Sequence, residues 1–189
     1  KGLLDDAPAV SLQLDEFDGD FYCDDITCTP IEEHFPDYSI LEDVEYDYAV
    51  KDAYFAYASR GCIRKCKFCG VPKLEGAQRQ TPSLLPLIEA VKERHGEKKD
   101  LVLMDNNVVA APNFREIIAE IRDLGFERGA VIYRKRRPIQ RRVDFNQGVD
   151  ARILCKSPEF LKQISTIAIR PLRIAFDHTG VTKPYEQSI

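Results

Sequence analysis

The stretch "DLVLMDNNVVAAPNFREIIAEIRDLG", residues 100–125, contains the two signals that decide the fold class. It opens with a short apolar run that ends in polar residues, which is the pattern of a buried strand in a parallel sheet. Its second half then places four apolar residues at helical spacing, with Gly125 behind them as the expected C-cap (Phe114, Ile117, Ile118, Ile121). A strand followed at once by an amphipathic helix predicts one βα unit.

The same alternation extends in both directions along the chain. Before this stretch, "AYFAYASRGC" predicts a strand, and a helix is expected to start at Thr81 and Pro82. After it come a strand near residues 142–146, a helix starting at Ser157 and Pro158, and a last strand in "PLRIAFDH". Repeated βα units predict a parallel sheet. Because four strands cannot close an eight-stranded barrel, we expect an α/β fold, a partial (β/α) barrel of about four βα units.

The charge is distributed unevenly. Residues 1–50 contain 15 Asp and Glu against the single basic residue Lys1, whereas the remaining residues contain 26 Lys and Arg against 16 Asp and Glu. We therefore expect an acidic, mostly irregular N-terminal arm over residues 1–50, whose aromatic side chains dock on a core formed by residues 51–189. The basic run "RKRRPIQRR", residues 134–142, reads as an exposed connection, with a phosphate- or RNA-facing surface as the alternative.

The composition places limits on the environment of the protein. Hydrophobic residues make up 44% and charged residues 31% of the chain, which is typical of a soluble globular protein. No apolar run approaches the roughly 20 residues of a membrane helix, and nothing near Lys1 resembles a signal peptide. We expect a cytoplasmic protein that does not bind membranes, and a chain that is part of a longer one. Cysteines in that compartment serve metal or redox chemistry more often than disulfides.

Three of the six cysteines lie within the segment "RGCIRKCKFCGVPK", residues 60–73. Cys62, Cys66 and Cys69 have the spacing C-x3-C-x2-C. A zinc site needs four ligands, usually from two paired half-sites, and the remaining cysteines offer no matching pair (Cys23, Cys28, Cys155). Three thiolates suit a [4Fe–4S] cluster that leaves one iron open. A zinc site and reduced structural thiols stay open as alternatives.

This cysteine pattern after a first strand, with Phe68 just before the last cysteine, resembles the signature of the radical S-adenosylmethionine (radical SAM) family. The segments "HFPDYS", "LMDNN", "VDFNQGVDAR" and "LRIAFDH" are also similar to Fe–S oxidoreductases of that family. The resemblance implies that the three cysteines hold a [4Fe–4S] cluster, that S-adenosylmethionine chelates the open iron, and that Phe68 packs near the adenine. It further implies reductive cleavage to a 5′-deoxyadenosyl radical, with electrons from an external flavodoxin- or ferredoxin-like donor.

Polar residues at the expected strand ends are candidates for the walls of this site, because ligands gather at the carboxyl ends of parallel strands. The family's glycine-rich segment, which grips the methionine amino group, is replaced here by "MDNN", so we assign that contact to Asp105, Asn106 and Asn107. An ordinary strand-to-helix turn is the alternative for these three residues. Gln147, Arg152 and Asp177 are further candidate cofactor contacts. His178 is either a proton donor or a structural histidine.

Two classes of function follow. The first is a radical SAM enzyme that abstracts hydrogen from an unknown substrate, which is anionic or an RNA. The second is a non-catalytic Fe–S or zinc module that binds RNA through its basic body.

Overall fold

The computed structural model describes residues 35–41, 44–46, 48 and 50–189. Cys23, Cys28 and most of the expected acidic arm lie outside these residues. The chain divides into two units at Pro36 and Asp37, and the fold described below is that of the second unit, Asp37–Ile189.

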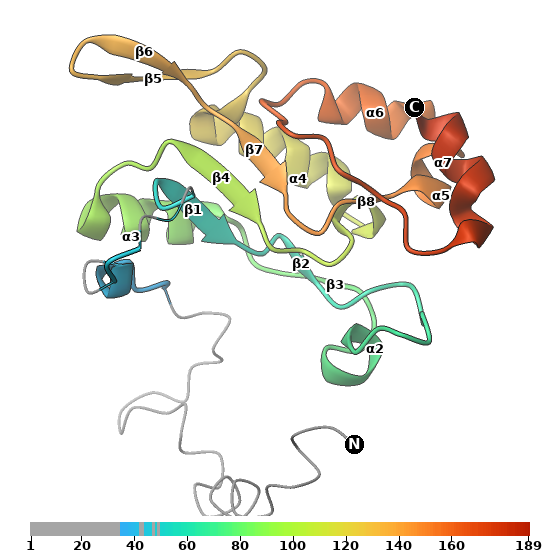
Figure 1. The fold of residues 1–189 in the computed structure, drawn as a ribbon. Helices are drawn as coiled ribbons and strands as arrows, with labels where there is room; N and C mark the ends of the chain where they lie inside the picture. The colour runs from blue at the N-terminus through green and yellow to red at the C-terminus, as the bar shows by residue number, and fades with distance from the viewer. Residues whose placement is uncertain (1–34, 42–43, 47, 49) are drawn as a thin grey trace, which may run out of the picture. The chain divides into compact units, whose positions relative to one another are not determined.

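A parallel three-stranded sheet forms the centre of this unit (Figure 1). Its strands are β1 (Ala53–Ala56), β4 (Asp100–Leu103) and β7 (Val143–Phe145), in the order β1-β4-β7. β1 pairs with β4 and β4 pairs with β7, both in parallel. The predicted α/β class and the predicted parallel sheet are therefore confirmed, and the described strands do not close into a barrel.

The fourth expected strand consists of two short pieces. Ile169 forms a single parallel bridge to Val143, on the side of β7 that faces away from β4. Further on, β8 (Val149–Asp150) pairs in parallel with β9 (Ile174–Ala175). The chain after the last predicted helix thus runs beside β7 and then beside its continuation.

The three helices predicted from the pattern are α3 (Leu85–His95), α4 (Phe114–Ile121) and α6 (Pro158–Ile164). α3 begins four residues later than expected, because Thr81 is held beside the end of β1: its N–H and hydroxyl donate to the carbonyls of Ala58 and Tyr57. The remaining helical elements have seven residues or fewer: η3 (Ser39–Leu41), α2 (Val71–Leu74), η4 (Val108–Ala110), η5 (Arg122–Phe126), α5 (Ala151–Leu154), η6 (Thr179–Val181) and α7 (Thr182–Ser188).

The core lies where α4 packs against one face of the sheet. The strand register places Tyr54, Leu101 and Val143 in one row and Ala56, Leu103 and Phe145 in the next, and all six side chains are buried. The apolar face of α4 joins the same cluster, as its spacing predicts (Phe114, Ile117, Ile118, Ile121). Burial of one such large side chain stabilises the fold by about 1.5–3 kcal/mol. This core fixes the strand ends at which the candidate site lies.

The basic run is a β-hairpin, and its prediction as a plain connection is wrong. β5 (Val131–Arg134) pairs antiparallel with β6 (Arg137–Gln140). The two residues between them, Lys135 and Arg136, have φ angles of 49° and 65°. Positive φ at both central positions is the requirement of a type I′ hairpin turn, which Asn-Gly usually meets. The hairpin was missed because Lys-Arg is not a turn signal.

Tyr38 confirms the expected docking of an aromatic side chain from the N-terminal segment. Its hydroxyl accepts a hydrogen bond from the Phe55 N–H at 3.0 Å, and its ring centroid lies 5.3 Å from that of His95. Tyr46 and Tyr48, by contrast, are exposed and pack on each other, with ring centroids 4.9 Å apart.

Candidate functional site

The cysteine loop, residues 62–69, is closed at its base by a pair of short strands, which we call the loop neck (residues 59–61 and 75–80). β2 (Ser59–Arg60) and β3 (Arg79–Gln80) pair antiparallel on its two sides. Gly61 enters the loop with φ +75°, and a Cβ atom there would lie 2.3 Å from the carbonyl oxygen of Ala77. Only glycine fits this position, because both the backbone conformation and the space exclude a side chain.

Glu75 ties this neck to the end of the central strand. Its Oε2 accepts hydrogen bonds from the Gly61 N–H at 2.8 Å and from Nδ2 of Asn106 at 3.1 Å. The Nε of Arg60 lies 3.2 Å from the same oxygen. The predicted site residue Asn106 therefore positions the loop neck through Glu75, a residue that the sequence pattern did not single out.

The three cysteines of the loop are partly exposed, and none forms a disulfide. The Cys69 N–H donates to the carbonyl of Cys66 at 3.1 Å, and the Arg64 N–H donates to Sγ of Cys62 at 3.4 Å. Among the described residues, no three His, Cys, Asp or Glu side chains are arranged to hold a metal ion. The thiols are thus accessible and not bonded to one another, and the fit to a cluster lies in the type of the donors and their spacing in the sequence.

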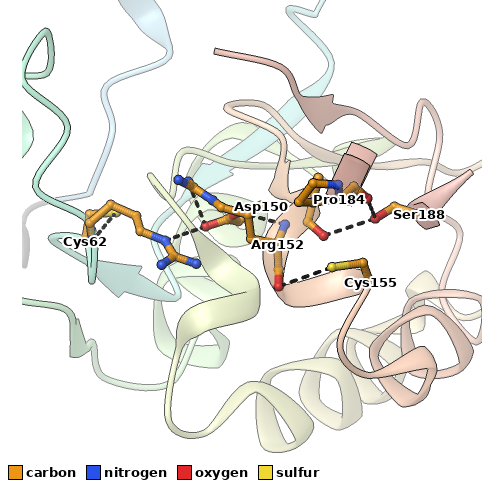
Figure 2. Close-up of polar contacts among 8 residues, drawn as sticks. Cys62, Asp150, Arg152, Cys155, Pro184 and Ser188 are labelled. Carbon is orange, nitrogen blue, oxygen red and sulfur yellow. Dashed lines mark hydrogen bonds and ion pairs between the residues drawn. The ribbon is translucent and has the colours of Figure 1, made fainter. Parts of the chain in front are cut away.

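Arg64 connects the cysteine loop to the end of β8, where Figure 2 shows Asp150 beside Arg152. Its Nε donates to Oδ2 of Asp150 at 2.7 Å, and Nε of Arg152 donates to Oδ1 of the same carboxylate at 2.7 Å. The Arg152 backbone N–H also donates to Oδ1, which makes Asp150 the N-cap of α5. Burial alone would raise the pKa of Asp150, but the hydrogen bonds from Arg152 and Arg64 outweigh it and lower the pKa.

A surface pocket of about 460 Å³ lies where the loop meets these strand ends. Residues 64–68 line one part of it, and Arg152, Asp177 and His178 line the other. The structure thus brings together Cys66, Phe68, Arg152 and Asp177 as the sequence predicts.

The pocket has a positive charge. Lys65, Lys67 and the two arginines outnumber the carboxylate of Asp177 in its lining. The hydrogen bond to Asp150 raises the pKa of Arg152, with smaller contributions from the charges of Asp150, Cys66 and Asp177. Such a pocket suits an anionic group.

Asp105 lies beneath the loop neck and does not line the pocket. Its residue is 3% exposed, and its two carboxylate oxygens accept hydrogen bonds from the Ala58 N–H at 3.0 Å and the Ser59 hydroxyl at 2.6 Å. Burial raises the pKa of Asp105 to about 6, although these hydrogen bonds oppose the shift. Asp105 therefore holds the end of β1 beside the end of β4.

The other predicted residues differ in their surroundings. Asn107 is 4% exposed, and its Oδ1 has no hydrogen-bond partner within the described part of the chain. Oε1 of Gln78, whose Nε2 donates to the Asn107 carbonyl at 3.2 Å, is also buried without a partner. Gln147 is exposed on the turn after β7 and does not line the pocket. His178 accepts a hydrogen bond at Nδ1 from the Gly180 N–H at 3.1 Å.

Comparisons of the chain with protein-family models, with curated proteins and with solved structures found no match. None of the helices in the described part of the chain has the length and apolar composition that crossing a membrane requires.

Proposed function

We propose that the chain binds a [4Fe–4S] cluster through Cys62, Cys66 and Cys69 and, with an external flavodoxin- or ferredoxin-like donor, cleaves S-adenosylmethionine to a 5′-deoxyadenosyl radical that abstracts hydrogen from a substrate. The observation on which this rests is the position of the three accessible thiols, in one loop that follows the first strand of a parallel sheet. Ligand sites of α/β proteins lie at this end of their strands.

The surroundings of the loop support the proposal. Basic residues alternate with the cysteines in the loop (Arg64, Lys65, Lys67). Arg152 lies close enough to Cys66 for Cys66 to contribute to the raised pKa of Arg152. Positive charge around the loop complements the anionic cluster that three thiolates would form. Zinc also binds thiolates, but a structural zinc site takes four protein ligands and the loop supplies three cysteines.

The pocket beside Cys66 supports a ligand with the chemistry of S-adenosylmethionine. Arg152 suits its carboxylate, and the exposed ring of Phe68 suits stacking on its adenine. Asn107 is outside the pocket lining, and its Oδ1 is buried without a partner; the assignment of the amino contact to Asn107, among the three residues of "DNN", rests on that free acceptor and on its place after β4. Asp105 and Asn106 then act by positioning, because their polar atoms are engaged with the loop neck.

We also propose that the sheet is part of a (β/α) barrel wall. Each new strand lies beside the one before it, in the order β1, β4, β7 and then the segment at Ile169. A barrel adds its strands in this way, whereas a doubly wound sheet reverses direction at its switch point.

Anaerobic reconstitution with iron and sulfide tests the function. The expected product is a brown protein with about four irons per chain that releases 5′-deoxyadenosine from S-adenosylmethionine when dithionite is added. Cys66→Ala should lose the cluster absorbance and the product. Cys155→Ala is the matched control, because Cys155 lies outside the loop, with its Sγ 3.6 Å from the Arg152 carbonyl. It should retain both.

Three results would contradict the proposal. They are a colourless protein that holds stoichiometric zinc, an intact cluster in Cys66→Ala, and a reconstituted cluster that yields no 5′-deoxyadenosine. The first would favour the non-catalytic zinc module.

A further inference from the structure

The β5–β6 hairpin is a fixed element, because two arginines attach it to neighbouring segments: Arg134, the last residue of β5 before the turn, and Arg141, the residue after β6. Arg134 donates to the carbonyl of Glu97, and its Nη2 lies 3.5 Å from Oδ1 of Asp52. Arg141 is 7% exposed; it donates to the carbonyls of Lys98 and Lys99, and its guanidinium lies 4.0 Å from the ring centroid of Phe126. These contacts hold the hairpin at its base and just before its turn, and the turn itself lies away from the central sheet (Figure 1).

The tip of the hairpin has positive charge that none of the described residues compensates. Lys135, Arg136 and Arg137 are exposed, and none of them forms an ion pair with a described residue. The sequence has no Asp or Glu from residue 128 to residue 143. Most surface charges in a protein of mixed composition have opposite charges nearby, so a tip of this kind is suited to a polyanion.

One face of the hairpin is apolar and open. The register pairs Tyr133 with Pro138 and Val131 with Gln140, so these four side chains lie on the same face. Tyr133 is 67% exposed and Val131 is 46% exposed. An exposed aromatic ring beside a proline, directly behind three positive charges, provides a stacking surface for a base next to contacts for its phosphates.

We propose that this hairpin binds single-stranded RNA, with Tyr133 stacking on an unpaired base and Lys135, Arg136 and Arg137 contacting phosphates. A duplex also has phosphates for the three basic side chains to contact. Its bases are stacked on each other, however, so none would be free to stack on the Tyr133 ring. The hairpin leads into the first residue of β7, whereas the cysteine loop follows the last residues of β1. In a parallel sheet these positions are at opposite ends, so this binding surface is separate from the candidate cluster site.

The charge contribution is tested with the double variant Lys135→Asn, Arg136→Gly in the full chain. Asn-Gly is the preferred type I′ turn, so the variant removes two charges while favouring the hairpin. The probe is a fluorescein-labelled single-stranded RNA of mixed sequence and about 12 nucleotides, measured by anisotropy over a range of salt concentrations. We expect the slope of log K against log salt to decrease by about 1.4, which corresponds to two lost contacts with a single strand.

The matched control is Lys156→Asn with Lys183→Gln, which removes two exposed charges elsewhere. It should leave the affinity unchanged within twofold, and a loss equal to that of the hairpin variant would overturn the proposal. So would an unchanged affinity in the hairpin variant, provided that circular dichroism shows the same fold.

The aromatic contribution is tested with Tyr133→Ala against Tyr133→Phe. The alanine variant should bind the RNA about tenfold more weakly, and the phenylalanine variant should bind as the parent does, because the ring is retained. Equal affinities of these two variants would overturn the stacking role. Duplex RNA of the same length that binds as tightly as the single strand would overturn the choice of ligand.

Discussion

The Nε atom of Arg64 lies 2.7 Å from Oδ2 of Asp150, although 86 positions separate the two residues in the chain. This contact joins the cysteine loop to the end of β8. The Asp150 side chain is 6% exposed and holds two arginines at once, so it fixes the loop and the guanidinium of Arg152 relative to each other. The positions of Arg64 and Arg152, both of which line the pocket, therefore depend on one carboxylate.

We expect Asp150→Asn to lower the free energy of unfolding by about 3 kcal/mol, because two arginines lose a charged partner and α5 loses part of its cap. The pKa of Asp150 is lowered in the folded protein. Its stabilisation is therefore complete above the pKa of the unfolded chain and is lost as the pH falls through the folded pKa. Urea unfolding at neutral and acidic pH should show the difference between parent and variant shrinking below about pH 4.

Asp144→Asn is the matched control for this measurement. Asp144 forms an ion pair of similar geometry with Arg173, with both arginine–carboxylate distances at 2.9 Å, but the Arg173 side chain is 48% exposed. Solvent screening should limit its loss to about 1 kcal/mol or less. Equal losses in the two variants would show that Asp150 is no more than a surface partner.

Gly61→Ala should destabilise the loop neck by about 2 kcal/mol or more, since left-handed strain adds to a collision with the Ala77 carbonyl. Gly76→Ala is the control: its φ is +77°, but nothing lies within 4 Å of the added Cβ. It should lose only about 1 kcal/mol from strain. Thermal unfolding of both variants checks the difference, and equal values would mean that the neck relaxes around the new methyl group.

Much of the fold could be predicted from the spacing of apolar residues, because that spacing reflects which side chains the folded protein buries. The residues at helical spacing in α4 are the ones that the core buries, and Gly125 adopts φ +81° as a residue that ends a helix does. The shorter elements could not be predicted. The two-residue strands β2 and β3 have no periodicity, and the hairpin turn places Lys and Arg at positive φ, where tertiary anchoring by Arg134 and Arg141 overrides local preference.

The candidate site was predictable only where residues follow strands directly. Cys66, Phe68, Arg152 and Asp177 meet at one pocket because parallel strands end on the same side. The roles of Arg64 and Glu75 were missed, since both act through partners distant in sequence, Asp150 and Asn106. Charge complementarity between the basic loop and the acid before Arg152 was the one signal that could have indicated the first of these pairs.

Tyr38→Phe should lower the free energy of unfolding by about 1 kcal/mol, because the Phe55 N–H at the edge of the sheet loses its acceptor while the ring packing is retained. Tyr46→Phe is the control, since the Tyr46 side chain is 69% exposed, and should change nothing. Urea unfolding measures both variants. A Tyr38→Phe protein as stable as its parent would mean that water accepts the hydrogen bond of the Phe55 N–H in place of the hydroxyl, with no loss of stability.

Asp105 should make the protein less stable as the pH rises through about 6. Burial raises the pKa of its carboxyl to about 6 from an ordinary 3.8, so the folded protein retains a proton that the unfolded chain has already released. A carboxyl group whose pKa is raised in the folded protein contributes its full stabilisation at pH values below the pKa of the unfolded chain. This stabilisation is lost as the pH rises through the pKa of the folded protein. A shift of this size corresponds to about 3 kcal/mol.

Asp105→Asn separates this contribution from those of the other carboxylates. The amide can accept from the Ala58 N–H and donate to the Ser59 hydroxyl, so it retains both contacts without titrating. We expect the stability of the parent minus that of the variant to fall by about 3 kcal/mol between about pH 3 and pH 7. A difference that stays constant over this interval would mean that Asp105 keeps an ordinary pKa. The loop neck would then rest on a carboxylate that is ionised over most of this interval, from about pH 5 upward.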